Sequence, residues 1–598
     1  MLDHTAASTQ IQNVLSELDH ALQSRNLDDA LKLFADECYW RDLLSFTWNI
    51  KTLESKGEIR HMLEERLVDV RPTGWAVDEP DFAMHTENTT EGFIRFDSPI
   101  GSGYGHIRLK GGLIWTLLTT MQDLKRYEFS RPFGAKHGEY QGEPNWAEER
   151  EAELSELGVT TQPYVLIIGA GQNGLSLGAR LRQLEVPALI VEQNERPGDN
   201  WRKRYRTLCL HNPVWENPFP YMDFPANWPI FTPKDKYADW LEAYAKLMEL
   251  NIWGRTRAKR ASYNQDSQTW TVVVERNGEE ITLQPKQLVL ATGSEGSRPY
   301  MPEIPGQGLF KGIQQHSAEF SGTDSMMGKK VVVVGSGTSA HDICGDLAQN
   351  GADATMIQRS SAYVVKSESF MKHVLGPIYS AEAVAAGVTA EKADLLNASI
   401  PLARFFDFAK PAVDKIRELD ADFYQALEDV GFLLDFGPGD SGLFGKALTR
   451  TFNYYIDIGT SQLILDGRVK LASGAGVKEL TEDSVVLEDG REIQADVVIY
   501  ATGFELMENW VSELLGPDVA NKVGMVGGFG SGQPKDPGPW EGDFRNLFKP
   551  TQQEGLWICA GLIAFARFYS HFLSLQLKAR MEGVPTPVYG LQKTCQSG

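Results

Sequence analysis

Apolar residues occur along this chain in short runs, each followed by glycines and then by a helix-like pattern. Residues 164–168, Tyr-Val-Leu-Ile-Ile, form a run typical of a buried parallel strand. The stretch 175–184 then carries leucines at helical spacing. Residues 331–334 are four valines, and apolar residues at helical spacing follow over 340–347. This alternation of strands and helices predicts an α/β fold with parallel sheets.

The turn after the first run has the glycine spacing of a dinucleotide-binding loop. Gly169 permits a tight turn, Gly171 lets the backbone approach a pyrophosphate, and Gly174 lets the helix pack closely on the strand. The start of that helix offers unpaired N–H groups to phosphate. The next predicted strand, 187–191, ends at Glu192, 18 residues beyond Gly174, where a carboxylate can bind ribose hydroxyls. We expect one dinucleotide here.

A second loop of the same kind follows 331–334. It keeps Gly335 and Gly337, and Ala340 occupies the third position, where alanine is an accepted variant. The strand that follows ends in Arg359 and Ser360, with no acid. A cation there suits the 2′-phosphate of NADP, so we expect NADP rather than NAD. The alternative is an ordinary arginine at an exposed strand end.

Two further segments, 288–293 and 498–503, each combine a short apolar strand with Ala-Thr-Gly. Each lies downstream of its own glycine loop and ends in a small-residue turn. Two loops with two such segments indicate that two dinucleotides are held at once. An enzyme with that property usually passes a hydride from one dinucleotide to the other.

Around these loops the chain resembles the class B flavin-dependent monooxygenases, most closely the YUCCA-like flavin-containing monooxygenases, over about residues 160–595. Between the loops, Phe310, Gly312, His316 and Phe320 fit the pattern F-x-G-x-x-x-H-x-x-x-(F/Y) of that family. Further similarity is carried by 199–211, 224–234 and 454–459. The resemblance implies two Rossmann-type domains that bind FAD and NADPH. It also implies a C4a-(hydro)peroxy flavin that oxygenates a small organic substrate with molecular oxygen.

Three reactions follow from this resemblance. N- or S-oxygenation and oxidative decarboxylation of a 2-oxo acid are favoured over Baeyer–Villiger oxygenation, because Phe320 stands where Baeyer–Villiger relatives usually carry Trp. A non-catalytic scaffold with a degenerate oxidoreductase domain is the second alternative, although both loops keep their glycines. His316 is expected to be structural, linking the two nucleotide domains.

The candidate site residues combine the loops with positions implied by the resemblance. Asn212 is the candidate catalytic residue, because an amide in a comparable segment of the family can hydrogen-bond the hydroperoxide; the alternative is an Asn-Pro turn. The candidate FAD-binding residues are Gly169, Gly171, Asn173, Gly174, Glu192, Gln193, Trp201, His211, Ala258, Ala291, Thr292 and Gly293. The candidates at the second dinucleotide are Gly335, Gly337, Thr338, Ser339, Ala340, Arg359, Ser360, Ala501, Thr502 and Gly503.

The first 130 residues have a different pattern. Helical stripes at 11–22 and 57–68 are followed by alternating strands at about 75–84, 91–97, 104–110 and 113–120, which is an α+β order. This part resembles the cone-shaped SnoaL-like and nuclear-transport-factor-two-like folds. Such cones can hold a pocket with Asp42 or His106, although packing and dimer contacts are the simpler roles. The expected boundaries are 1–135 for this domain, 136–160 for a linker, 161–324 and 471–598 for the FAD domain, and 325–470 for the NADP domain.

Composition narrows the remaining possibilities. The net charge of −22 disfavours nucleic-acid binding. We expect no secretory signal, no membrane insertion and a cytoplasmic protein, and a homodimer stays open. The five cysteines include no C-x-x-C pair and no Cys/His cluster, so no metal is expected. A flavin disulfide reductase needs a cysteine pair beside the flavin, so oxygen is the expected oxidant.

Overall fold

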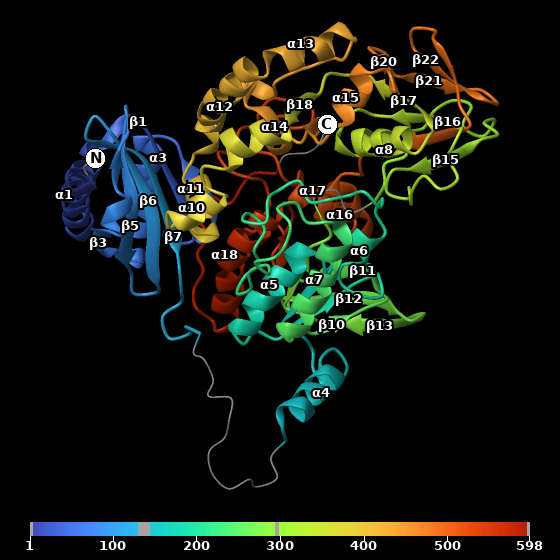
Figure 1. Ribbon diagram of the computed structural model, residues 1–598. Helices are drawn as coiled ribbons and strands as arrows, with labels where there is room; N and C mark the ends of the chain where they lie inside the picture. Colours follow the sequence, from blue (N-terminus) through green and yellow to red (C-terminus); the bar gives the residue numbers. More distant parts are fainter. Residues whose placement is uncertain (1–3, 130–143, 294–297, 595–598) are drawn as a thin grey trace.

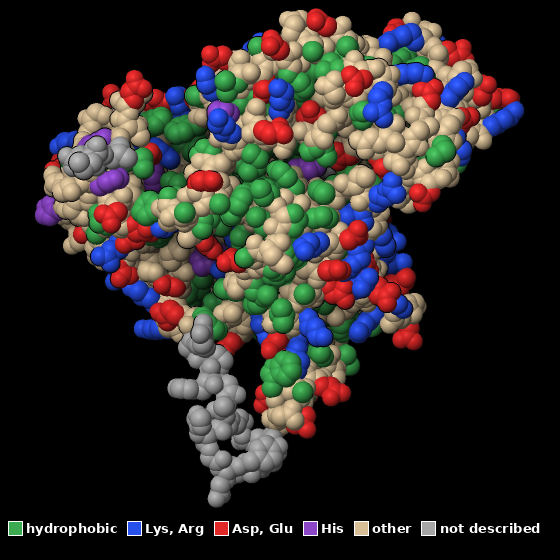
Figure 2. Space-filling view, in the orientation of Figure 1, with side chains coloured by type: hydrophobic (Ala, Val, Ile, Leu, Met, Phe, Trp, Pro, Cys, Tyr) green, Lys and Arg blue, Asp and Glu red, His purple; other side chains and the backbone are tan. Residues whose placement is uncertain are grey.

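The computed structural model describes residues 4–129, 144–293 and 298–594. It contains an N-terminal α+β unit, two α/β units with parallel sheets, and a helical segment that lies beside both the N-terminal unit and the second α/β unit (Figure 1). The α/β fold with two Rossmann-type units, expected from the alternation of strands and helices, is confirmed. Among the described residues, no helix combines the length and the apolar character needed to cross a membrane. Hydrophobic side chains gather in the middle of the face seen in Figure 2.

The N-terminal unit is a mixed sheet covered on one face by helices. Its strands lie in the order β2-β1-β7-β6-β5-β3, and β4 pairs with β5. The face toward the helices is filled by aromatic side chains, with Trp75 stacked on Phe96 at 4.4 Å between ring centroids and Trp40 in edge contact with Phe46. The helices and strands expected here are present; the resemblance to a SnoaL-like cone stays a prediction. The elements are α1 (His4–Gln23), α2 (Leu27–Lys32), β1 (Phe34–Leu43), β2 (Ile50–Leu53), α3 (Lys56–Val70), β3 (Thr73–Val77), β4 (Met84–His85), β5 (Thr90–Asp97), β6 (Ser102–Lys110) and β7 (Leu113–Met121).

The first α/β unit has a five-stranded parallel sheet in the order β10-β9-β8-β14-β25. Its strands are short and buried, which explains their continuous apolar runs. Helix α5 contacts both α7 and α18, and an antiparallel sheet β11-β12-β13 extends the unit. The elements are α4 (Trp146–Glu156), β8 (Val165–Ile168), α5 (Gln172–Gln183), β9 (Ala188–Val191), α6 (Asp199–Arg202), α7 (Lys234–Leu247), β10 (Ile252–Trp253), β11 (Thr256–Asn264), β12 (Thr269–Arg276), β13 (Glu279–Leu283), β14 (Gln287–Leu290), α16 (Met507–Leu515), α17 (Pro517–Val523), β25 (Leu556–Ile558) and α18 (Ile563–Met581).

The second α/β unit has the sheet order β15-β24-β16-β17-β20, and all four pairings are parallel. In sequence, the strands of this sheet extend from β15 to β24; the expected domain bounds of 325–470 stay a prediction. Strand β24 fills the position between β15 and β16 and brings Ala501 to the second loop. The elements are β15 (Ile313–His316), β16 (Lys330–Val334), α8 (Thr338–Gln349), β17 (Asp353–Gln358), α15 (Thr460–Leu465), β20 (Val469–Ser473), β21 (Val477–Leu480), β22 (Ser484–Leu487), β23 (Glu492–Gln494) and β24 (Val497–Tyr500).

The segment between β17 and β20 is mainly helical. It is anchored by a parallel pair of short strands, β18 and β19, and its helices lie above α18 in Figure 1. The elements are β18 (Tyr363–Lys366), α9 (Ser367–Phe370), α10 (Ala381–Ala385), α11 (Ala390–Ala398), α12 (Phe405–Leu419), α13 (Ala421–Asp429), α14 (Gly442–Leu448) and β19 (Tyr454–Asp457).

The second face of the N-terminal sheet packs on the first α/β unit. Leu43 and Leu118 on that face share one hydrophobic core with Phe572 and Leu573 of α18. The two faces of the sheet therefore belong to different cores. The N-terminal unit is attached to the rest of the protein by a buried apolar surface as well as by the chain.

Candidate active site at two dinucleotide loops

The first glycine loop has the geometry that a bound pyrophosphate needs. A Cβ added at Gly169 would lie 2.6 Å from the Ala291 carbonyl oxygen, and one at Gly174 would lie 1.9 Å from the Gly169 oxygen. These two glycines are required by the packing itself. No atom lies within 4 Å of a Cβ added at Gly171, so space is open in front of that residue. Gly171 is also the N-cap of α5, with no side-chain cap, so the N–H groups of the first turn are available to an anion.

The Glu192 carboxylate lies beside this loop. Its Oε2 accepts a hydrogen bond from Ala170 N at 2.9 Å, and its Oε1 accepts from Asn194 N at 2.9 Å and Asn194 Nδ2 at 2.7 Å. Parallel strands β8 and β9 end side by side here, which places the carboxylate next to the turn. The strand end and the loop together form the arrangement that binds a nucleotide ribose.

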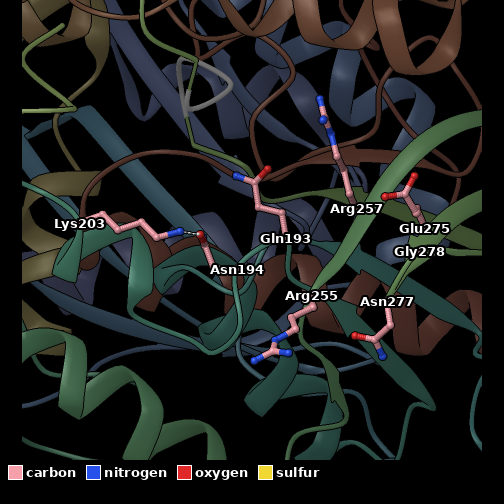
Figure 3. A pocket seen from close by; sticks show the side chains of 8 residues that line it. All are labelled: Gln193, Asn194, Lys203, Arg255, Arg257, Glu275, Asn277 and Gly278. Atoms are coloured by element: carbon pink, nitrogen blue, oxygen red, sulfur yellow. Dashed lines mark hydrogen bonds between the residues drawn. The ribbon is translucent and has the colours of Figure 1, made fainter. Parts of the chain in front are cut away.

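A hollow lies at Gln193 and Asn194, the two residues that follow Glu192 in the sequence (Figure 3). Its lining is polar and contains three cations, and Lys203 donates a hydrogen bond to Asn194 Oδ1 at 2.5 Å. The lining residues are Gln193, Asn194, Lys203, Arg255, Arg257, Glu275, Asn277 and Gly278.

The second loop repeats the geometry of the first. A Cβ at Gly335 would lie 2.5 Å from the Ala501 oxygen, which corresponds to the approach of Gly169 to Ala291. Gly337 caps α8 without a side-chain cap, and the nearest atom to its added Cβ is 3.6 Å away. Ala340 is buried against the sheet core, so the alanine replaces the third glycine without loss of packing. Both loops therefore fit a dinucleotide phosphate group.

The end of β17 presents Arg359 at the position that Glu192 holds in the first unit. Arg359 and Ser360 are both exposed. Within the described residues the Arg359 guanidinium has no ion pair. Its Cδ lies 3.1 Å from a Cβ added at Gly476, so this glycine leaves room for the arginine stem. An exposed cation at this point suits a 2′-phosphate.

Several other expected residues lie around the two loops. Asn173 Nδ2 donates to Gly561 O, and Thr338 Oγ1 donates to Tyr454 O at 2.9 Å. Trp201 packs edge-on against Tyr237. Ala258 lies in β11, and Ser339 lies in the first turn of α8. Ala291 follows β14 and lies against Gly169, and Ala501 follows β24 and lies against Gly335. Thr292, Gly293, Thr502 and Gly503 continue these two turns, with both glycines at positive φ.

Asn212 has a buried acidic neighbour that sequence reasoning missed. Its side chain hydrogen-bonds the carboxyl group of Glu216, which is buried, and Glu216 Oε2 has no partner among the described residues. Burial raises the pKa of Glu216 to about 7; the Asn212 hydrogen bond and the Arg567 charge counteract this, and Asp394 adds to it. A buried acid in a Pro- and Asn-rich turn carries no periodic signal, so sequence alone could not place it.

The two α/β units are joined near Asn212. Tyr205 donates a hydrogen bond to Asp342 Oδ2 at 2.7 Å, and His211 Nε2 lies 3.9 Å from the same oxygen. Burial is the main cause that raises the pKa of Asp342 and lowers the pKa of His211. Asp342 belongs to α8, directly behind the second loop. This contact therefore connects the second dinucleotide helix to the segment that carries Asn212.

The middle signature is part of the packing. Phe310 and Phe320 are buried core residues, and a Cβ at Gly312 would lie 2.3 Å from the Asp496 oxygen. His316 is 1% exposed, accepts a hydrogen bond from Ala318 N at 3.1 Å and packs edge-on against Phe504. These contacts agree with a structural role for His316.

The candidates in the N-terminal unit also have structural surroundings. Asp42 accepts hydrogen bonds from Phe46 N, Thr47 N, Thr47 Oγ1 and Thr119 Oγ1. His106 is buried, and burial together with the Arg108 charge lowers its pKa well below the usual value. Asp42 therefore fixes a turn of this unit.

No group of His, Cys, Asp and Glu that could hold a metal ion occurs among the described residues. Four cysteines fall in the same part of the chain, and all are unpaired: Cys38, Cys209, Cys344 and Cys559. The loops and strand ends thus offer sites for two dinucleotides without a thiol pair between them. This combination defines the class of a two-dinucleotide oxidoreductase.

Comparison with known proteins identifies the family. Residues 166–397 match the pyridine nucleotide-disulphide oxidoreductase family. Indole-3-pyruvate monooxygenase YUCCA1 of Oryza sativa subsp. japonica is 30% identical over 366 residues, which is 59% of this chain and 80% of that protein. Probable indole-3-pyruvate monooxygenase YUCCA1 of Arabidopsis thaliana is 30% identical over 382 residues, 63% of this chain and 82% of that protein. A flavin-containing monooxygenase structure from Stenotrophomonas maltophilia aligns at a TM-score of 0.46 with 20% identity, covering 70% of this chain and 99% of that chain.

The chain belongs to the family of flavin-dependent monooxygenases that includes the YUCCA proteins. It is an enzyme that uses FAD and NADPH, as expected from the two loops.

Proposed function

We propose that this monooxygenase oxygenates a small organic molecule at nitrogen or sulfur, or oxidatively decarboxylates a 2-oxo acid. The observation that carries the proposal is the Tyr205–Asp342 contact, which brings the second dinucleotide helix to the segment of Asn212. Both cofactors would then meet at one place, next to a side-chain amide. The plant relatives are named for a 2-oxo acid, indole-3-pyruvate, which supports the decarboxylation branch.

We assign FAD to the first loop. The available N–H groups of α5 would bind its pyrophosphate, and Glu192 would bind a ribose. The hollow at Gln193 and Asn194 would take the adenine (Figure 3), and Ala258 would add a contact from β11. The remaining contacts would come from Gly169, Gly171, Asn173, Gly174, Gln193, Trp201, His211, Ala291, Thr292 and Gly293.

We assign NADPH to the second loop in the same manner. Arg359 and Ser360 would bind the 2′-phosphate at the end of β17. The pyrophosphate would lie on the first turn of α8. The remaining contacts would come from Gly335, Gly337, Thr338, Ser339, Ala340, Ala501, Thr502 and Gly503.

The two cofactors supply the redox chemistry: NADPH provides a hydride, and reduced FAD activates oxygen. The chain supplies geometry and charge. Helix α18 begins at Ile563, directly after the Gly561 carbonyl that Asn173 contacts, so its positive end faces the first loop. Asn212 would hold the reacting oxygen with its amide, and Glu216 would orient that amide.

Baeyer–Villiger oxygenation is the alternative that uses the same cofactors. The residue that disfavours it, Phe320, is 0% exposed and packs with Tyr205 and Leu208 in the core of the second unit. Phe320 can therefore act on the reaction through packing alone. To distinguish the proposed reactions from Baeyer–Villiger oxygenation, NADPH consumption in air is measured with 2-oxo acids, amines, sulfides and cyclic ketones. The products are identified by mass. Lactones as the sole products would contradict the proposal.

A further inference from the structure

One buried guanidinium connects the N-terminal unit to the monooxygenase. Arg41 of β1 donates from Nε and Nη2 to the two carboxylate oxygens of Asp543, at 2.8 and 2.9 Å. Its Nη1 donates to the Ala398 oxygen at 2.8 Å, and Nη2 also donates to the Tyr569 hydroxyl at 3.0 Å. Arg41 and Asp543 are 3% and 0% exposed. Arg41 therefore contacts α11, α18 and the loop before β25 simultaneously.

A second buried guanidinium belongs to α18 itself, two residues before Tyr569. Arg567 donates from Nε and Nη2 to Asp394, at 2.8 and 2.7 Å. Its Nη1 donates to the carbonyl oxygens of Glu216 at 2.7 Å and Pro218 at 2.6 Å. Arg567 and Asp394 are 1% and 3% exposed. This arginine fixes the backbone of the turn that carries Asn212.

The two arginines share the same two helices. Ala398 and Asp394 lie one turn apart on α11, and Tyr569 and Arg567 lie two residues apart on α18. The contacts form a continuous buried path from β1, through α11 and the first turns of α18, to the turn at 212–218. That path crosses the part of α18 that faces the first glycine loop.

Stability is a weak explanation for such contacts. A buried ion pair often contributes no more to stability than well-packed apolar residues of the same size, because removing the charges from water is costly. Two buried guanidiniums that form all these hydrogen bonds do provide a fixed geometry, because the planar group points each N–H in a set direction. The path therefore constrains where α18 and the 212–218 turn lie relative to each other.

We propose that the N-terminal unit is a positioning part of the oxygenation site, and that Arg41 is its positioning residue. Without this arginine, α18 and the 212–218 turn stay tied to each other through Arg567 but lose their fixed relation to β1, although both glycine loops stay intact. The inference rests on the proposed function only in calling this site the place of oxygenation. Whether Arg41 positions α18 and the 212–218 turn can be tested without knowing the reaction.

The test uses the full-length flavoprotein with both charges removed together, as R41Q/D543N. The amides keep hydrogen-bonding capacity for Thr52 and for the Phe544 N–H group, so no unpaired charge is left between them. The glutamine is too short to reach Ala398, Asp543 and Tyr569 together. R60Q is the matched control, because Arg60 pairs with Asp28 on the exposed surface of the same unit.

Hydrogen–deuterium exchange is the first measurement. In R41Q/D543N we expect backbone amides of 563–571 and of 211–219 to exchange about tenfold faster, in both FAD-loaded and FAD-free protein. Exchange over 165–183, the first loop and its helix, should match the wild type. FAD content and the rate of flavin reduction by NADPH should also be unchanged. In air without added substrate, NADPH oxidation with equivalent hydrogen peroxide should accelerate several-fold. R60Q should behave as the wild type in every measurement.

Wild-type exchange at 211–219 together with a wild-type rate of peroxide formation in R41Q/D543N would overturn the proposal. Faster exchange throughout the protein, including 165–183, would also overturn it, because Arg41 would then act on overall stability. If wild-type protein fails to oxidise NADPH, the proposed function fails, while the exchange result still decides the positional claim.

Discussion

The 2′-phosphate assignment makes a quantitative prediction at Arg359. The side chain is exposed at the end of β17, and no ion pair within the described residues competes for it. A charge-assisted hydrogen bond to phosphate contributes about 1.5–3 kcal/mol, and exposure to solvent favours the lower part of that range. Because about 1.4 kcal/mol corresponds to a tenfold change in affinity, Arg359→Ala should weaken NADPH binding about 10- to 30-fold. NADH binding should change little, since NADH has no 2′-phosphate.

Two neighbouring substitutions sharpen this test. A Cβ in Gly476→Ala would lie 3.1 Å from Arg359 Cδ and should displace the arginine, with a smaller loss for NADPH. Glu488 Oε2 lies 3.1 Å from the same point, so Glu488→Gln should strengthen NADPH binding by removing a repelling charge. Dissociation constants for both nucleotides, measured by flavin-reduction kinetics at two salt concentrations, check these outcomes. Equal losses for NADPH and NADH in Arg359→Ala would refute the assignment.

Three further predictions concern the buried groups and the first loop. Gly171→Leu should abolish FAD binding, because the leucine would fill the open space at the loop, whereas residues 4–129 should stay folded. Circular dichroism checks that the protein is folded. FAD that is still released on denaturation, identified by mass, would contradict this prediction. Glu216 has a pKa raised to about 7 from 4.5, so the folded protein resists its ionisation and should lose about 3 kcal/mol of stability as pH rises from 4.5 to 7; Glu216→Gln should lack this loss in urea unfolding. His341 is buried with its pKa lowered to about 4 from 6.5, so stability should fall by about 3 kcal/mol as pH falls from 6.5 to 4. His341→Phe should remove that dependence, and an unchanged pH slope would disprove it.

The sequence predicted the dinucleotide units because their signals are local. A buried strand, three small residues at fixed spacing and a helix occupy one stretch of chain, and each glycine has a steric reason that the structure shows directly. Glu192 was predictable for the same reason, because β8 and β9 are adjacent parallel strands. The order of strands in the second sheet could not be predicted in the same way, because sheet order is not local. Strand β24 is inserted between β15 and β16, far from both in sequence.

Only those residues of the candidate site that belong to a local motif, or lie beside one, could be predicted from the sequence. Asn212 was predictable because its segment resembles one of the family. Its neighbour Glu216 was not, because Glu216 is buried by contacts with α18, which lies about 350 residues further along the chain. The same holds for Arg41, whose partners come from α11, α18 and the loop at 543. In a strand whose residues alternate between apolar and polar, an arginine is expected to face solvent. Only the second apolar core on that face of the sheet shows that it is buried.

The position of the N-terminal unit gives this architecture a physical logic. A flavoprotein that activates oxygen must keep water from the reacting atoms and hold its donor groups in a fixed place. In the proposed site, α18 would serve this task at the first loop. Its apolar face is covered by the N-terminal sheet through Leu43 and Leu118, and Arg41 and Arg567 bind it to its neighbours. Removal of the N-terminal unit should therefore raise hydrogen peroxide formation before it weakens cofactor binding.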